Sequence, residues 1–165
     1  MENGFSIRLA TEADRDELTS MRYATLQNRY QGYLPEQNFK KLNRAYAAKE
    51  VDEWLQNSAC QIGILSSATG RKGYVACVPD TEMQDWGLIL DAGDEAPVST
   101  VEMQLLLQWA DSVLKSKGCS QTHIWVLQDN LRGRFMVENF GFKQQKELKL
   151  VQEADYTLTV RHYIL

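Results

Sequence analysis

The sequence predicts an α/β domain in which one mixed central β-sheet is flanked by helices on both faces. Short alternating or apolar runs, typical of strands, are interleaved with segments whose apolar residues recur at helical spacing. The chain has 165 residues, which suits one domain spanning residues 1–165. Its composition is 44% hydrophobic with three prolines, which predicts a globular core rather than disorder.

The first third of the chain predicts one strand and two helices. Residues 5–10 alternate as a strand does. Thr11, followed by Asp14 three positions later, resembles a capping box, so a helix is expected to begin near Glu12. Pro35 suits the first turn of a second helix, because its missing N–H costs little there. The apolar stripe of that second helix would comprise Phe39, Leu42, Ala45 and Tyr46, continued by Trp54 and Leu55.

The rest of the chain predicts six more strands and two more helices. A long helix is expected from Thr100 to Lys117, where apolar residues form a continuous core-facing stripe before Gly118 ends it. A short helix at 130–140 ends at Gly141. The predicted strands are 59–67 and 72–79, joined as a hairpin, then 83–91, 122–128, 143–151 and 156–165. The resulting order is β-α-α-β-β-β-α-β-α-β-β.

Charge and cysteine usage exclude several function classes. The formal net charge is −4, so nucleic acid and anionic membranes are poor default partners. The three cysteines are far apart in sequence and lack metal-binding spacing, so reduced thiols and a cytoplasmic location are expected. No apolar run is long enough to span a bilayer, and residues 1–14 lack the basic and apolar regions of a signal peptide.

Residues 127–142, LQDNLRGRFMVENFGF, resemble the second cofactor-side motif of the GNAT superfamily of acyl-CoA-dependent acyltransferases. Residues 7–18 are similar to the opening strand and helix of that family, and residues 30–42 to the link between its first two helices. The order of elements matches from end to end. The residues that carry the motif are Asn130, Gly133, Phe135, Glu138, Gly141 and Phe142.

The resemblance implies a GNAT-like fold and an N-acetyltransferase, in which an amine of a small molecule or peptide attacks an acyl-CoA thioester directly in a ternary complex. Acetyl-CoA or a related acyl-CoA would be the cosubstrate, without a metal, and a homodimer is common in the family. Two alternatives stay open. One is a GNAT-fold pseudoenzyme that serves as a binding or regulatory module without acyl-CoA chemistry, and the other is a scaffold whose acidic face binds a basic partner protein.

Acyl transfer needs a strand edge for the pantetheine amides and hydrogen-bond donors for the diphosphate. The resemblance assigns the strand edge to Leu90 and Ala92. It assigns the diphosphate to the helix start formed by residues 99–102 and to the second motif. The cofactor-binding residues expected there are Ser99, Thr100, Val101, Glu102, Asn130, Arg132 and Arg134.

Two departures from the family pattern weaken the expected activity. The family's diphosphate loop resembles Gln/Arg-x-x-Gly-x-Gly, whereas this chain has Val98, Thr100 and Glu102 near the glycine positions. From Glu82 to Leu114 there are seven acidic residues and no lysine or arginine, so the diphosphate would need basic help from Arg132, Arg134 or Arg71. The family commonly has a tyrosine, proposed to protonate the thiolate, where this chain has Val137, which has no proton to donate.

Most candidate residues also have a plain structural interpretation. Ser99 and Glu102 form a capping box, with Val98 and Met103 as a hydrophobic staple, and Asn130 would cap the short helix. Asp85 is a candidate base for the amine, or else a solvated loop charge. The acceptor site would be lined by Tyr30, Tyr33 and Trp86, with Tyr33 and Trp86 together forming an aromatic lining. The alternative is that these aromatic residues serve in packing. His123 and His162 are expected at opposite ends of the final sheet region, in structural roles.

Overall fold

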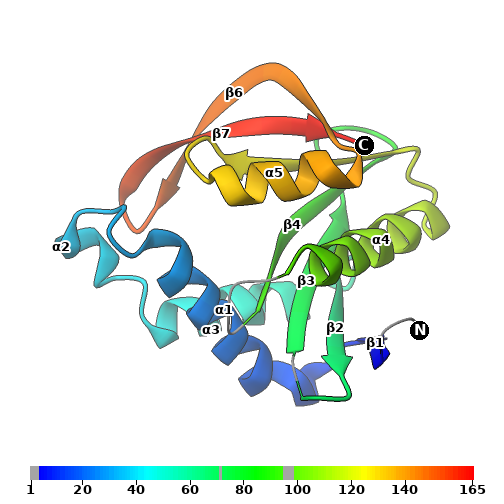
Figure 1. Cartoon of the computed structure of the whole chain (residues 1–165), viewed down its shortest axis with the longest axis horizontal. Helices are drawn as coiled ribbons and strands as arrows, with labels where there is room; N and C mark the ends of the chain where they lie inside the picture. The colour runs from blue at the N-terminus through cyan, green and yellow to red at the C-terminus, as the bar shows by residue number, and fades with distance from the viewer. Residues whose placement is uncertain (1–3, 71, 95–98) are drawn as a thin grey trace.

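The computed structural model describes residues 4–70, 72–94 and 99–165, and its elements follow the predicted order (Figure 1). Seven strands form one sheet in the order β1-β2-β3-β4-β5-β7-β6, in which only the β4–β5 pair is parallel. The predicted mixed-sheet α/β fold is confirmed. The strands are β1 (Phe5–Leu9), β2 (Gln61–Ser67), β3 (Lys72–Pro79), β4 (Trp86–Asp94), β5 (Gln121–Leu127), β6 (Lys143–Glu153) and β7 (Tyr156–Ile164). The helices are α1 (Arg15–Tyr30), α2 (Glu36–Phe39), α3 (Arg44–Gln56), α4 (Thr100–Ser116) and α5 (Leu131–Phe140), with a 3₁₀ turn η2 (Glu12–Asp14) before α1.

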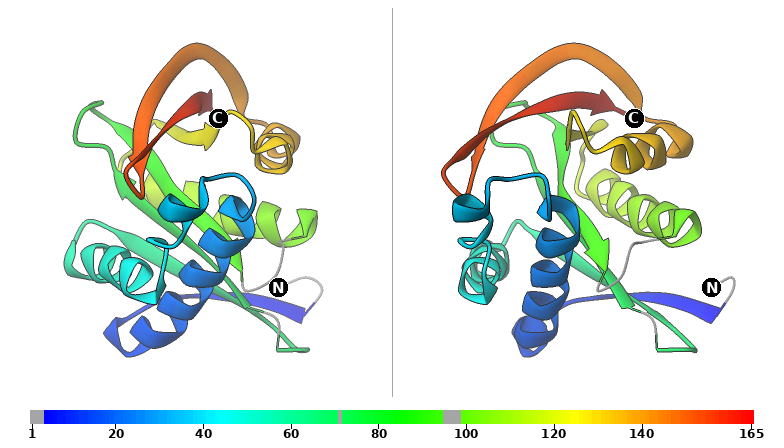
Figure 2. Two further views of the ribbon diagram at one scale, coloured as in Figure 1. Left: turned by 90° about the vertical axis from the view of Figure 1, so that its left-hand side faces the viewer. Right: turned by 60° about the vertical axis from the view of Figure 1, so that its left-hand side comes forward.

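Helices cover both faces of the sheet (Figure 2). Alternate residues of β3 show the two layers, because successive side chains of a strand point to opposite faces. Val75 and Cys77 belong to the core that contains the apolar stripe of α4. Tyr74 and Ala76 pack instead with α1 and α3 on the opposite face. Among the described residues, no helix is long and apolar enough to cross a bilayer.

The sheet opens between β4 and β5. The two strands pair only from Trp86 to Ile89 on β4, so the C-terminal half of β4 has no partner in β5. The register between β3 and β4 skips Leu90, which is the extra residue of a β-bulge. The ribbons of β4 and β5 diverge toward the C-terminal end of β4 (Figures 1 and 2). A free backbone edge therefore lies in the middle of the sheet, where an extended ligand can add hydrogen bonds.

The prediction of one continuous second helix is wrong, because two separate helices, α2 and α3, occupy that span. The segment begins after Pro35 as expected, but α2 is a single turn and α3 starts again at Arg44. The Asn43 side chain accepts a hydrogen bond from the Tyr46 N–H at 2.9 Å and so caps α3. The helical spacing of the apolar residues continues across the break, which is why the stripe alone predicted one helix.

The β6–β7 hairpin has a two-residue turn in which both residues are left-handed, Ala154 with φ 52° and Asp155 with φ 61°. This is the arrangement of a type I′ turn. The Asn38 side chain donates to the Ala154 carbonyl at 3.0 Å, and Lys41 pairs with Asp155 at 2.6 Å. These contacts fasten the tip of the hairpin to α2 and to the link that follows it. They also fix the position of Glu153, the last residue of β6.

Candidate functional site

Two adjoining cavities, of about 230 and 220 Å³, occupy the opening between β4 and β5. Ala92, Met103 and Asn130 line both of them, together with Arg29 and Gly133. The first cavity is otherwise lined by residues of α1, α5 and the end of β4. The second continues between the halves of the sheet to β6 and β7. Together they form a passage through the sheet.

The N-terminus of α4 begins beside this passage. The Ser99 Oγ accepts from the Glu102 N–H at 3.2 Å and a Glu102 carboxylate oxygen accepts from the Ser99 N–H at 3.2 Å, so the predicted capping box is present. The N–H groups of Thr100 and Val101 have no hydrogen-bond partner among the described residues, as is usual in a first helical turn. They are donors available to an anion. The predicted staple residue Val98 lies outside the described residues, as does Arg71.

The second helix N-terminus at the passage belongs to α5. The Asn130 side chain accepts from the Gly133 N–H at 3.0 Å and caps the helix. A Cβ on Gly133 would lie 2.5 Å from the Asn130 amide nitrogen, so any larger residue would force the capping side chain to shift. Arg132 lines the first cavity. The Arg134 guanidinium instead donates to the Tyr163 hydroxyl, the Gln128 carbonyl and the Gln144 side chain, which ties α5 to the sheet.

Asp91 is neutralised by two arginines of α1. Its carboxylate accepts from Arg22, from Arg29 at 3.0 Å and from the Tyr74 hydroxyl. Burial alone would raise the pKa of Asp91, but Arg29 and Arg22 outweigh it and hold that pKa below its ordinary value. The acidic character of the C-terminal half of β4 is therefore partly balanced by cations from a distant part of the chain.

The roles of Arg22 and Arg29 were not recognised from the sequence. The two residues are seven positions apart on the same side of α1 as the buried Leu26, so they lie within its core-facing stripe. Charged residues inside such a stripe are a signal that each requires a buried partner. Arg29 lines both cavities and is a cation at the passage that the sequence analysis did not propose.

An outer group of polar side chains surrounds this ion cluster on the side of β6. Arg22 makes two hydrogen bonds to Glu50, at 3.1 and 3.0 Å, and lies 3.8 Å from Glu153. The Tyr46 hydroxyl donates to Glu153 at 3.0 Å. Glu153 and Tyr30 both line the second cavity, and burial raises the pKa of the Tyr30 phenol to about 12.

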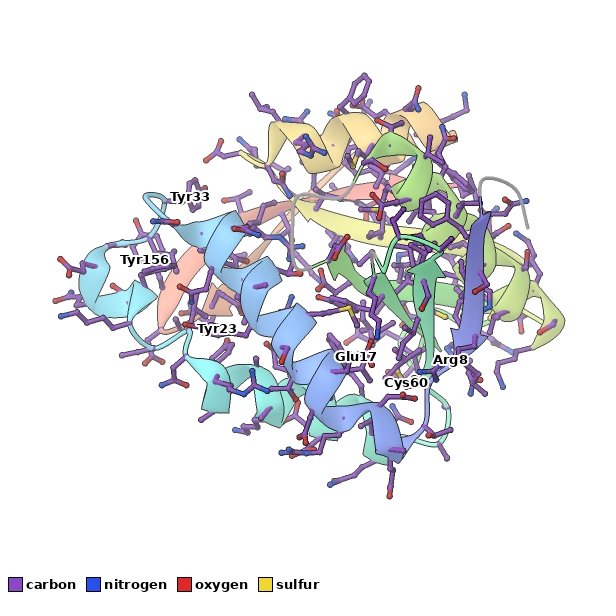
Figure 3. The ribbon with its side chains drawn as sticks, turned by 60° about the horizontal axis from the view of Figure 1, so that its bottom comes forward. Arg8, Glu17, Tyr23, Tyr33, Cys60 and Tyr156 are labelled. Carbon is purple, nitrogen blue, oxygen red and sulfur yellow. The ribbon has the colours of Figure 1, made fainter. Side chains whose placement is uncertain are left out.

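The remaining predicted acceptor-side residues lie apart from one another. Asp85 is left-handed, with φ 64°, in the turn before β4, and its carbonyl accepts from the Ser120 N–H at 2.7 Å. Asp85 precedes Leu90 by five residues, so at the rise of a β-strand, about 3.3 Å per residue, it lies about 16 Å from Leu90. Trp86 packs near the start of β5, whereas the Tyr33 hydroxyl donates to Asp129 beyond its far end. Tyr33 follows the C-terminal end of α1 and lies near Tyr156, the first residue of β7 (Figure 3).

The two histidines are not at opposite ends of the sheet region, which corrects the expectation. Antiparallel pairing puts His162 opposite Trp125, two residues from His123 and on the same face. The His123 Nδ1 lies 2.8 Å from the His162 Nε2, and the His123 Nε2 lies 2.6 Å from an Asp80 carboxylate oxygen. The contact depends on the pairing of β5 with β7, which neither strand reveals from its own sequence.

Comparisons with known proteins bear on the fold. No protein-family model and no curated protein matches the chain. The PaiA N-acetyltransferase of Thermoplasma acidophilum, solved in complex with coenzyme A, matches 96% of this chain and 97% of its own, with a TM-score of 0.69 and 16% identity. An N-acetyltransferase of Staphylococcus aureus Mu50 matches 98% and 97%, with a TM-score of 0.72 and 16% identity. A ribosomal-protein-alanine N-acetyltransferase of Brucella melitensis matches 97% and 98%, with a TM-score of 0.71 and 14% identity. The predicted GNAT-like architecture is thereby confirmed at the level of the fold.

Proposed function

We propose that this GNAT-fold chain is an N-acyltransferase that transfers an acyl group, most simply acetyl, from acyl-CoA to an amine. The observation that carries the proposal is the opening of β4 from β5 beyond the bulge at Leu90, with a passage running through the sheet at that point. A thioester and an amine can approach each other from opposite sides of such a passage. This geometry suits direct attack in a ternary complex.

The described residues suit the parts of acyl-CoA in order. The free edge of β4 offers backbone groups to the pantetheine amides. The N–H groups of Thr100 and Val101, which have no partner among the described residues, would hold the diphosphate together with the side chains of Arg29 and Arg132. The bulge at Leu90 has backbone groups outside the β3 ladder, and its N–H is our candidate donor to the thioester carbonyl oxygen, where negative charge develops.

The balance of the transfer follows from these positions. The amine lone pair attacks the thioester carbon, the C–S bond breaks, the thiolate departs with the electron pair, and the nitrogen loses one proton to a base or to water as the amide forms. Val137 is buried in the wall of the second cavity and has no proton to give. The thiolate therefore leaves unprotonated or takes its proton from water.

Isothermal titration calorimetry with acetyl-CoA tests the proposal. The unmodified protein should bind, and Ala92→Trp should weaken binding at least about tenfold, about 1.4 kcal/mol, because the indole fills both cavities. Leu150→Trp is the matched control, since Leu150 is 70% exposed on the outer strand β6. Circular dichroism establishes that both variants are folded. Absence of binding at millimolar acetyl-CoA would refute the proposal.

A second candidate is a GNAT-fold binding module without acyl transfer, and the apolar Val137 in the wall of the cavity favours it. The two functions differ in turnover rather than in binding. Acetyl-CoA would be incubated with the protein and with primary amines of several classes, and release of the free thiol would be followed. Binding without thiol release above the rate without protein would favour the second candidate.

A further inference from the structure

Five charged side chains meet at the side of the passage that faces β6. Two are guanidiniums, Arg22 and Arg29, and three are carboxylates, Glu50, Asp91 and Glu153. The group therefore carries one more negative than positive charge when every member is ionised. Partly buried charges are stable only where partners compensate them, so the location of the surplus charge matters.

The contacts place the surplus on Glu153. Asp91 accepts from both arginines, and Glu50 takes two hydrogen bonds from Arg22. Glu153 has only a 3.8 Å approach to Arg22 and one hydrogen bond from the Tyr46 phenol. Its side chain is 16% exposed. Glu153 is thus the carboxylate of the cluster with the weakest compensation.

Glu153 also stands on the wall of the cavity that reaches the bulge. Leu90 and Glu153 line this cavity from opposite halves of the sheet, and Trp125 and Val151 supply apolar wall between them. The hairpin turn pinned by Asn38 holds the carboxylate in place. An ammonium ion in the cavity would meet a carboxylate on one side and the reacting edge of β4 on the other.

We propose that Glu153 is the catalytic base, the carboxylate that binds the acceptor as a primary ammonium ion and removes its proton. The inference rests on the proposed acyl transfer and specifies its acceptor class. One proton moves from the ammonium nitrogen to a Glu153 carboxylate oxygen, which frees the lone pair that attacks the thioester carbon. The C–S bond breaks, the thiolate leaves, and the second nitrogen proton passes to water.

Glu153 is suited to this proton transfer by its surroundings. Burial and the neighbouring Glu50 raise the pKa of Glu153, and together they outweigh Arg22, which lowers it. The net upward shift moves the pKa of Glu153 toward the range useful to a base near neutral pH. The charged and titratable groups around it are Arg22 and Tyr30 of α1, Tyr46 and Glu50 of α3 and Asp91 of β4. Asp85, the base expected from the sequence, lies about 16 Å from the bulge along β4 by the strand rise.

The test compares two small nucleophiles with acetyl-CoA. Butylamine reaches the site as an ammonium ion and needs a base, whereas hydroxylamine is largely uncharged at neutral pH and does not. Glu153→Gln should lower kcat/KM for butylamine about 100-fold or more and for hydroxylamine by less than about threefold. The part of the acidic limb that reports Glu153 should be lost from the butylamine pH profile, so that the remaining rate follows only the fraction of free amine.

Glu36→Gln is the matched control, because Glu36 is 84% exposed, pairs with Lys40 at 3.8 Å and lines neither cavity. It should keep the acidic limb and stay within about threefold of the unmodified protein for both nucleophiles. Equal loss on both nucleophiles in Glu153→Gln would indicate a structural role and overturn the proposal. So would unchanged rates, a loss that follows Asp85→Asn instead, or acetyl-CoA binding without transfer to either nucleophile. Failure to bind acetyl-CoA would refute the acyltransferase function itself.

Discussion

Replacing Asp91 by asparagine should destabilise the protein strongly, although the change removes only a charge. The Asp91 side chain is 9% exposed and accepts from two guanidiniums and a phenol. Asparagine keeps the volume but leaves Arg22, whose side chain is 6% exposed, with less compensation for its buried charge. Burial of an unpaired charge is among the costliest defects in a protein interior.

The magnitude follows from the loss of one member of a buried ion pair, which costs about 3–5 kcal/mol. In a chain of this size each kcal/mol lowers Tm by about 2–4 °C, so the expected fall is about 6–20 °C. Part of the cost should be recovered when Arg29 is neutralised as well. In Asp91→Asn/Arg29→Met the two changes should therefore be non-additive by about 1–3 kcal/mol, since the residues are in contact.

Urea unfolding followed by circular dichroism measures these differences. Asp16→Asn is the control, because Asp16 is 91% exposed and pairs with Arg15 only at 3.4 Å, so a change below about 0.5 kcal/mol is expected. The interpretation of Asp91 as a structural carboxylate fails if Asp91→Asn costs less than about 1 kcal/mol. It also fails if the Arg29 substitution adds its full effect to that of Asp91→Asn.

Two further predictions concern α5 and the first strand. Gly133→Ala should destabilise the protein by about 0.5–1 kcal/mol despite the better helix propensity of alanine, because its Cβ would displace the Asn130 cap. In an Asn130→Ala background, where there is no cap to displace, the same substitution should stabilise by up to about 1 kcal/mol. An equal effect in both backgrounds, measured by urea unfolding, would contradict the steric reasoning. The hydrogen bonds from Arg8 lower the pKa of Asp14 to about 2, so its contribution is present above pH 4 and lost as the pH falls toward 2. Asp14→Asn should therefore cost about 1 kcal/mol at pH 7, after allowance for solvent screening at the exposed Arg8, and only a small part of that at pH 2, where about half of the Asp14 carboxyl is protonated. A pH-independent difference would exclude this linkage.

The sequence was sufficient for the order of elements because those signals are local. Strand alternation, the capping box of Ser99 and Glu102 and the stop at Gly118 each act over a few residues. The same local signal failed at Asn43, where an apolar stripe continues through a break that only the cap reveals. Boundaries set by a side-chain hydrogen bond are poorly visible to periodicity.

The candidate site was harder to predict because its essential contacts join distant parts of the chain. Asp91 pairs with Arg22 and Arg29, which lie more than 60 positions earlier and belong to another layer of the fold. The contact between His123 and His162 likewise depends on the pairing of β5 with β7. The stretch of sequence around Asp91 contains acidic residues and no lysine or arginine. Its composition therefore overstates the negative charge that a ligand would meet in the folded protein.

The two cavities differ in charge in a way that suits two oppositely charged ligands. The first is lined by the cations Arg29 and Arg132 and by the carboxylate of Asp94, and the free N–H groups of α4 start beside it. The second is lined by Arg22, Arg29 and Asp91, whose net positive charge is balanced by Glu50 behind Arg22, and by Glu153 beyond them. An anion is therefore favoured on the side of α4 and α5, and a cation on the side of β6. Of these carboxylates, Asp94 lines the first cavity and Asp91 is paired with two arginines, so it is the weakly compensated Glu153 that makes the β6 side suited to an amine.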